Sequence, residues 1–213
     1  MSRLSIEDVQ NNPGFRPVKE LRFNEILTFV LENIRLTNLY TIFYLFFNFL
    51  FFGLLAVIIV IGIREDYFSF STFLSTMGWG VITGSILIIP FHEGFHALAF
   101  FVIGAQKIKF GVDFKQMIFY ATAKDFVADR KGFTLVALAP FAVINLISLP
   151  ILIYGGIGLR LFVIVSLLLH NIMCIGDFAM MSFYSSNKDK ELYTFDDLET
   201  KTAWFYEKVK GNT

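Results

Sequence analysis

Four stretches of the sequence are almost free of charged residues, and each is long enough to form a membrane-spanning helix. A bilayer core is crossed by about 20 helical residues. The stretches are residues 36–63, 67–106, 132–159 and 161–187. Only 17% of all residues are charged and 55% are hydrophobic, whereas a soluble domain carries about a quarter charged residues. The sequence therefore predicts an integral membrane protein with four transmembrane helices.

The basic residues lie almost entirely on one side of these stretches. Sixteen of the 18 Lys and Arg residues fall in the N-terminal segment, the connection between the second and third stretches, or the C-terminal tail. The other two connections hold only Arg64 and Arg160. Because positively charged loops stay in the cytoplasm, we expect both termini and the central connection on the cytoplasmic side of the cell membrane. With 18 acidic residues against 18 basic ones, nothing favours nucleic-acid binding.

We expect one membrane domain over residues 1–213, made of an N-terminal segment (1–35), a core (about 36–186) and a cytoplasmic tail (about 187–213). Apolar residues recur at helical spacing over 18–35, which predicts an amphipathic helix on the membrane surface. In the tail, Thr194 is a candidate helix cap, Trp204 and Phe205 are candidate membrane contacts, and Asp196 with Asp197 is expected to be a solvated face.

The connection between the second and third spans has the period of a strand. Polar and apolar residues alternate from Lys107 to Phe114, and a second strand is predicted at 117–120 after a polar break at Lys115 and Gln116. The predicted fold class is therefore an all-α membrane protein with four transmembrane helices and a small cytoplasmic β-hairpin beside the membrane. Pro140 and Pro150 are expected to kink the third span, with Asn145 pairing with freed backbone groups.

His92, Glu93 and His96 form an H-E-x-x-H motif inside the second span. Helical spacing puts the two imidazoles one turn apart, where both can reach one zinc ion, and Glu93 can accept a proton from the attacking water. Ionisable groups inside an apolar span cost roughly a few kcal/mol each, so they mark a functional site. We therefore predict a zinc site here.

A catalytic zinc site usually has three protein ligands, so one more donor is needed. Asp177 and His170 of the fourth span are the candidates. Counted from the cytoplasmic ends of their helices, His96 and Asp177 both lie about 16 Å deep, and His170 lies about 10 Å deeper. Equal depth favours Asp177 as the third ligand.

The remaining polar residues of the fourth span have two open interpretations. His170 and Asn171 are candidates for a hydrogen bond to the substrate carbonyl as it becomes an oxyanion. The alternative is that they only bond a neighbouring helix. The single cysteine, Cys174, is expected to be a packed thiol and not a ligand.

Several short motifs accompany these residues between about 85 and 185: His-Glu-Gly-Phe-His-Ala-Leu at 92–98, Tyr-Ala-Thr at 120–122, Leu-Ala-Pro-Phe at 138–141, and Gly-Asp at 176–177 in a helix that contains Asn171. Together they resemble the site-2 protease group of intramembrane zinc metalloproteases. They are more closely similar to a bacterial multi-pass family described as "putative zincin peptidases". One difference from site-2 proteases is that glycine precedes Asp177, where those enzymes have glycine after the aspartate and a proline before it.

The resemblance implies zinc held by His92, His96 and Asp177, with Glu93 as the catalytic base. It implies a metallopeptidase that works within or beside the lipid bilayer on a membrane-embedded protein or peptide. Two alternatives stay open: a metal-binding membrane scaffold or receptor without turnover, and an ion or proton pathway through the same ionisable residues.

Overall fold

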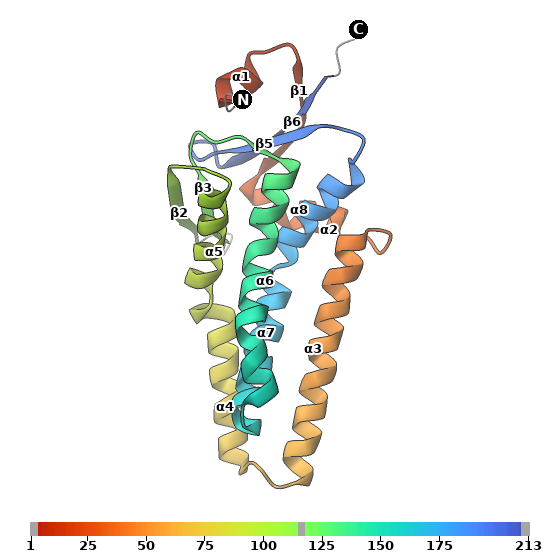
Figure 1. Ribbon diagram of the computed structural model, residues 1–213, viewed down its shortest axis with the longest axis vertical. Coiled ribbons are helices and arrows are strands. Elements are labelled where there is room, and N and C mark those ends of the chain that lie inside the picture. Colours follow the sequence, from red (N-terminus) through yellow and green to blue (C-terminus); the bar gives the residue numbers. More distant parts are fainter. Residues whose placement is uncertain (1–3, 115–117, 210–213) are drawn as a thin grey trace.

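The apolar stretches form a bundle of long helices, and strands from both ends of the chain gather at one end of it (Figure 1). The computed structural model describes residues 4–114 and 118–209. The predicted polar break at Lys115 and Gln116 lies outside the described residues.

The bundle is built from seven helical segments within the described residues. They are α3 (Leu39–Arg64), α4 (Phe70–Ile82), the π-helical turn η2 (Thr83–Leu87), α5 (Ile89–Val102), α6 (Arg130–Tyr154), α7 (Ile157–Met173) and α8 (Ile175–Ser186). The first long helix, the unit Phe70–Val102 and α6 are each long and apolar enough to cross a membrane. The segments α7 and α8 add a fourth span if the pair, bent by 44°, is counted as one. These lengths are compatible with a multi-pass membrane protein of three or four spans.

Two glycines let the second span approach α7 closely. Gly80 and Gly84 are one turn apart, and a Cβ atom on Gly84 would lie 2.4 Å from the carbonyl oxygen of Ser166. The Ser166 hydroxyl donates a hydrogen bond to the Gly80 carbonyl over 3.2 Å. Small residues at this spacing allow membrane helices to pack backbone against backbone. This contact holds α4 and η2 against α7.

The predicted hairpin is present. Strand β2 (Ile108–Asp113) pairs antiparallel with β3 (Ile118–Ala123), directly after α5. Its outward side chains Phe110 and Phe114 are strongly exposed. The alternation of polar and apolar residues therefore identified this element correctly.

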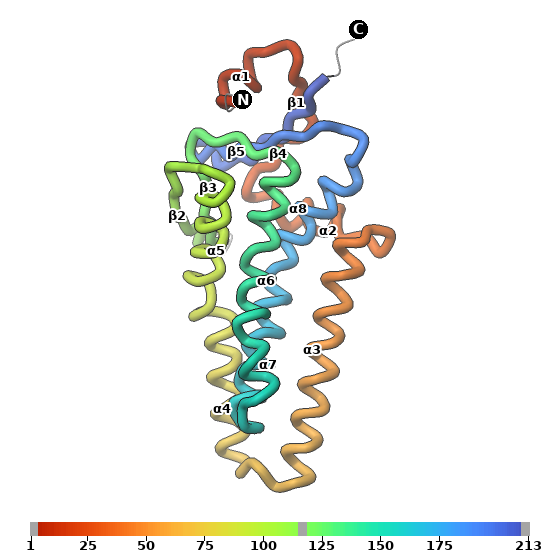
Figure 2. Tube along the Cα trace, viewed as in Figure 1, coloured from red at the N-terminus to blue at the C-terminus, as the bar shows by residue number. Residues whose placement is uncertain are grey.

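A second sheet joins the two ends of the chain and was not predicted. Its strand order is β1-β6-β5-β4, and its members are β1 (Phe15–Arg22), β4 (Ala128–Asp129), β5 (Leu192–Asp197) and β6 (Thr202–Lys208). Figure 2 shows the first strand running beside the last one at the end of the bundle. The N-terminal segment and the tail are thus parts of one structure.

The surface helix predicted over 18–35 is wrong for its first half. Residues 18–22 belong to β1, and after the 3₁₀ turn η1 (Phe23–Glu25) only α2 (Ile26–Asn33) is an α-helix. A further short helix, α1 (Ile6–Gln10), precedes the sheet. Pairing with a distant strand overrides the helical spacing of the apolar residues, because a strand needs only a partner and one buried face.

Two expectations for the tail are also wrong. Thr194 is not a helix cap but a buried residue of β5, and its hydroxyl donates a hydrogen bond to the Trp204 carbonyl over 2.9 Å. Phe205 does not contact a membrane. Its side chain is fully buried in a core that includes Tyr184 of α8. The sheet therefore packs onto the end of the helix bundle.

The acid pair is not simply a solvated face. Asp196 is partly buried, and the hydroxyl of Thr122 in β3 donates a hydrogen bond to its carboxylate. Burial raises the pKa of Asp196, and the hydrogen bond from Thr122 partly opposes that effect. A second link, an ion pair of 2.7 Å between Lys201 and Asp113, also joins the tail to the hairpin.

We expect Gly84→Ala to destabilise the protein by about 1–3 kcal/mol, because the added methyl group would overlap the backbone of α7. Gly78→Ala is the matched control, since nothing lies within 4 Å of a Cβ atom at that position on the same span. Thermal unfolding of both variants in detergent checks this, and equal midpoints would contradict the close contact.

Asp196 makes stability depend on pH. Its raised pKa means that the folded state binds this proton more tightly than the unfolded state does. The contribution of this tighter proton binding to the stability of the folded state is therefore complete below the ordinary aspartate pKa. It is lost as pH rises through the folded-state pKa. We expect Asp196→Asn, which keeps an acceptor for Thr122, to remove this loss. Unfolding midpoints of both proteins from about pH 4 to 8 test it, and parallel curves would refute it.

Candidate metal centre

The two histidines of the H-E-x-x-H motif and Asp177 bring three donor atoms together. His92 and His96 lie one turn apart on α5, with their Nε2 atoms 3.0 Å from each other. The carboxylate of Asp177 lies 3.4 Å from Nε2 of His96 and 3.6 Å from Nε2 of His92. Ligands of a tetrahedral zinc ion at about 2.0–2.1 Å stand about 3.3 Å apart. The triangle of donor atoms therefore has the size that zinc requires.

The break between α7 and α8 places Asp177 in this position. The helix α7 ends at Met173, and α8 begins at Ile175 with its axis bent by 44°. Asp177 lies in the first turn of α8. The carbonyl of Ile172, beside the break, accepts a hydrogen bond of 3.1 Å from the Tyr44 hydroxyl of α3. The structure thus brings together the two histidines and the acid that the depth count favoured.

A proline in α6 orients His96. The Nδ1 atom of His96 lies 2.9 Å from the carbonyl oxygen of Val136. In a regular helix that carbonyl accepts the N–H four residues later, but residue 140 is proline and has no N–H. The freed carbonyl accepts the proton of His96 Nδ1 instead. The sequence alone could have suggested this, because a proline four residues after an acceptor always frees it.

This hydrogen bond determines which nitrogen of His96 can bind a metal. A carbonyl oxygen only accepts, so Nδ1 carries the proton and Nε2 of the neutral ring keeps a lone pair. Metal-bound histidines commonly donate their other N–H to such an acceptor. Two nitrogens and a carboxylate oxygen are a donor set that suits zinc.

Glu93 lies beside this group and is held by the hairpin. Its side chain is partly buried, and the backbone N–H of Ala121 in β3 donates a hydrogen bond to its carboxylate. Lys124 donates to Lys107 across the hairpin, and hydrogen-bonded pairs alternate along antiparallel strands. The N–H of Ala121 therefore points away from β2, along the outer edge of β3.

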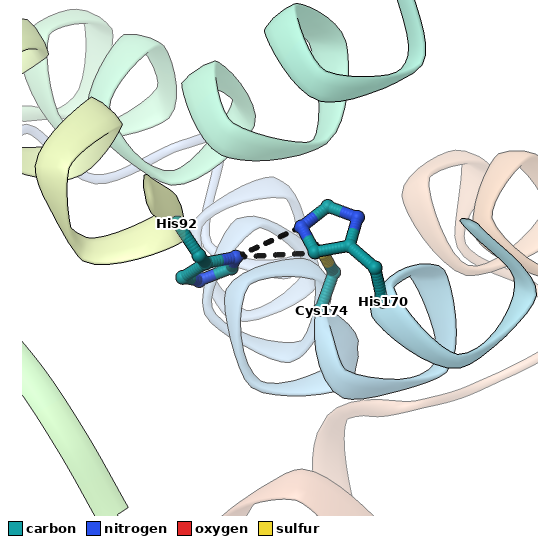
Figure 3. A group of neighbouring side chains, drawn as sticks. All are labelled: His92, His170 and Cys174. Atoms are coloured by element: carbon teal, nitrogen blue, oxygen red, sulfur yellow. Dashed lines mark hydrogen bonds between the residues drawn. The ribbon is translucent and has the colours of Figure 1, made fainter. Parts of the chain in front are cut away.

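Two further side chains, His170 of α7 and Cys174 at the break, lie on the other side of His92 (Figure 3). Nε2 of His170 lies 3.1 Å from Nδ1 of His92, and the sulfur of Cys174 lies 3.7 Å and 4.0 Å from those two nitrogens. His170, Asn171 and Cys174 have no solvent-exposed surface. Cys174 is packed as expected, but it also belongs to a second group of potential ligands with His92 and His170.

We expect Pro140→Ala to weaken zinc binding about 10-fold or more, because its new N–H would compete with His96 for the Val136 carbonyl. Pro150→Ala makes the same chemical change in the same helix, away from the site, and serves as control. Competition with a coloured chelator measures the affinity of each purified protein. Equal affinities in both variants would show that the freed carbonyl does not orient His96.

Comparison with known protein families matches residues 85–192 to a family described as "Putative zincin peptidase". The matched segment includes the motif of α5, Pro140, the break at Cys174 and Asp177. No curated protein and no solved structure matches the chain at a significant level. The family name indicates zinc-dependent peptidase activity, in agreement with the donor set. Since the match covers half of the chain, the protein belongs to this zincin peptidase family.

Proposed function

We propose that the protein is a zinc-dependent endopeptidase that cleaves a membrane-embedded or membrane-proximal protein or peptide. The observation that carries this proposal is the convergence of two imidazole nitrogens and one carboxylate beside Glu93, between helices that are long and apolar enough for a membrane. The family supports peptidase chemistry. The position of the site among apolar helices supports a substrate presented at or within the bilayer, as in the site-2 proteases that the sequence resembles.

The ligands of the proposed centre are His92, His96 and Asp177. When bound there, zinc supplies a Lewis acid that activates water and polarises a carbonyl group. Glu93, next to His92 in the chain, accepts the proton of the attacking water and returns it to the leaving amine. The hydrogen bond from Ala121 keeps the Glu93 carboxylate in one place between these two transfers.

The outer edge of β3 suits an extended substrate segment. A helical substrate hides its peptide bonds in internal hydrogen bonds, so it has to unwind locally before it is cut. A strand edge can bind the unwound segment by backbone hydrogen bonds. The N–H of Ala121 on this edge already reaches Glu93, so a segment added here would pass the proposed base.

We further propose that the chain lies in the cell membrane with both termini and the hairpin in the cytoplasm. The distribution of Lys and Arg supports this orientation. The terminal sheet and the hairpin lie at the same end of the bundle (Figure 1), so one cytoplasmic face accommodates all the strongly basic segments. The substrate is then reached from the cytoplasmic side.

A proton pathway is less well supported than hydrolysis. The polar side chains continue from His92 through His170 and Asn171 to Asn145, whose amide donates to the backbone carbonyl of Phe141. A backbone carbonyl cannot release a proton onward. Over the described residues, this chain of hydrogen bonds therefore ends inside the bundle and does not cross it.

We expect Glu93→Gln to retain zinc and to lower cleavage about 10²–10⁴-fold, the usual contribution of a general base. Glutamine keeps an oxygen that can accept the N–H of Ala121, so the local structure should persist. His92→Ala should lose both zinc and cleavage. Comparative membrane proteomics of cells with wild-type protein or Glu93→Gln should reveal a membrane protein that persists uncut.

The opposite result separates the peptidase from a metal-binding scaffold. If Glu93→Gln cells show the same cleavage products and phenotype as wild type while His92→Ala cells do not, the metal site serves structure or binding. Glu93 would then have no catalytic role, and the proposed function would fail.

A further inference from the structure

Three polar side chains, two of them fully buried and Asn145 partly buried, form a connected group behind His92. His170 and Asn171 lie at the end of α7, and Asn145 lies opposite them on α6. His170 and Asn171 are fully buried. Burying such groups in an apolar bundle is unfavourable unless their hydrogen bonds are satisfied. The donor and acceptor of each of these hydrogen bonds can be assigned in turn, and the last assignment determines which nitrogen of His92 carries a proton.

The assignment of donors and acceptors starts from the backbone carbonyl of Phe141. Nδ2 of Asn145 lies 2.7 Å from the carbonyl oxygen of Phe141 and 2.8 Å from Oδ1 of Asn171. The carbonyl can only accept, so the Asn145 atom facing it is the amide nitrogen, and its second proton points to Asn171. The Asn171 amide donates back to Oδ1 of Asn145 over 3.2 Å. The oxygen of Asn171 is thereby assigned as an acceptor.

The hydrogen bond to Asn171 also determines which nitrogen of His170 carries the proton. Its Nδ1 atom lies 3.3 Å from Oδ1 of Asn171, and two acceptors cannot bond each other, so Nδ1 carries the proton. A neutral imidazole has one donor and one acceptor nitrogen. Nε2 of His170 is therefore the acceptor, and it lies 3.1 Å from Nδ1 of His92. His92 must hold its proton on Nδ1.

We propose that Asn145, Asn171 and His170 are positioning residues that keep the His92 proton on Nδ1 and so direct its Nε2 lone pair at the metal. This inference rests on the proposed zinc site. Val136 does the same for His96. Two separate networks thus leave two lone pairs facing each other at 3.0 Å beside the Asp177 carboxylate. That arrangement is favourable only with a cation among the three groups.

The second group of potential ligands would require Nδ1 of His92 to bind a metal ion instead of carrying a proton. An ion held by Cys174, His170 and Nδ1 of His92 (Figure 3) would need that nitrogen deprotonated. If zinc also occupied the first site, the His92 ring would be an anion ligating through both nitrogens. The hydrogen-bond chain uses only neutral groups, each with its partner, and is therefore the preferred interpretation.

The test measures metal affinity and not cleavage. We expect His170→Leu, which removes the acceptor for His92, to weaken zinc binding of the purified full-length protein about 10–100-fold. His170→Gln retains an acceptor and a donor and should recover most of this loss. The visible absorption of the cobalt(II)-loaded proteins should change in His170→Leu and resemble wild type in His170→Gln, because the His92 ligand alters its orientation only in the former.

A substitution of Asn145 tests the end of the network farthest from His92, and a substitution of Asn48 in α3 is its control. Asn145→Leu should weaken zinc binding although the residue lies three hydrogen bonds away from His92. Asn48 of α3 likewise donates to the carbonyl four residues earlier, Tyr44, over 2.9 Å. Asn48→Leu should leave the affinity unchanged. In a His170→Leu background, Asn145→Leu should have no further effect, since it acts through His170.

The outcomes separate this inference from the proposed function. Absence of zinc binding by the wild type would overturn both. Tight wild-type binding that is unchanged in His170→Leu and Asn145→Leu would overturn the positioning role and leave the zinc site intact. Two metal ions per chain, one of them lost in Cys174→Ser, would also overturn it, because Nδ1 of His92 would then be a ligand.

Discussion

The structure depends on the meeting of two imidazole lone pairs and one carboxylate in an apolar bundle. Within the described residues, His92 and His96 direct their Nε2 atoms at each other and at Asp177. Without a cation, the two lone pairs and the carboxylate repel one another at these distances. A divalent ion turns the repulsion into ligation. The rest of the site can be understood as the means of keeping these atoms in place.

The fold achieves this with irregularities in its helices and not with regular packing. Pro140 frees a carbonyl that holds His96, and the break at Cys174 turns Asp177 towards α5. The hairpin reaches Glu93 through a backbone N–H, and Thr122 ties that hairpin to the terminal sheet. The four-stranded sheet therefore supports the proposed base from a distance, through two hydrogen bonds in series.

Sequence reasoning succeeded where one local pattern determines the outcome. The scarcity of charge located the apolar helices, and a period of two residues located the hairpin. Helical depth favoured Asp177, which lies beside His92 and His96, but it did not indicate that His170 also reaches His92, through the other ring nitrogen. Sequence reasoning failed for the sheet of β1 and β6, because residues 15 and 208 pair across almost the whole chain and local spacing contains no sign of the partner. It also missed the role of the Val136 carbonyl, although Pro140 four residues later is a sequence signal that this carbonyl is free to accept another hydrogen bond.

Zinc K-edge X-ray absorption on the purified protein tests the central claim most directly. The account predicts a first shell of nitrogen and oxygen at about 2.0–2.1 Å, with imidazole scattering from two rings and no sulfur. Asp177→Ala should lose one oxygen from that shell or lose the metal. A sulfur neighbour at about 2.3 Å would contradict the account, because it would place the ion with Cys174 on the other side of His92.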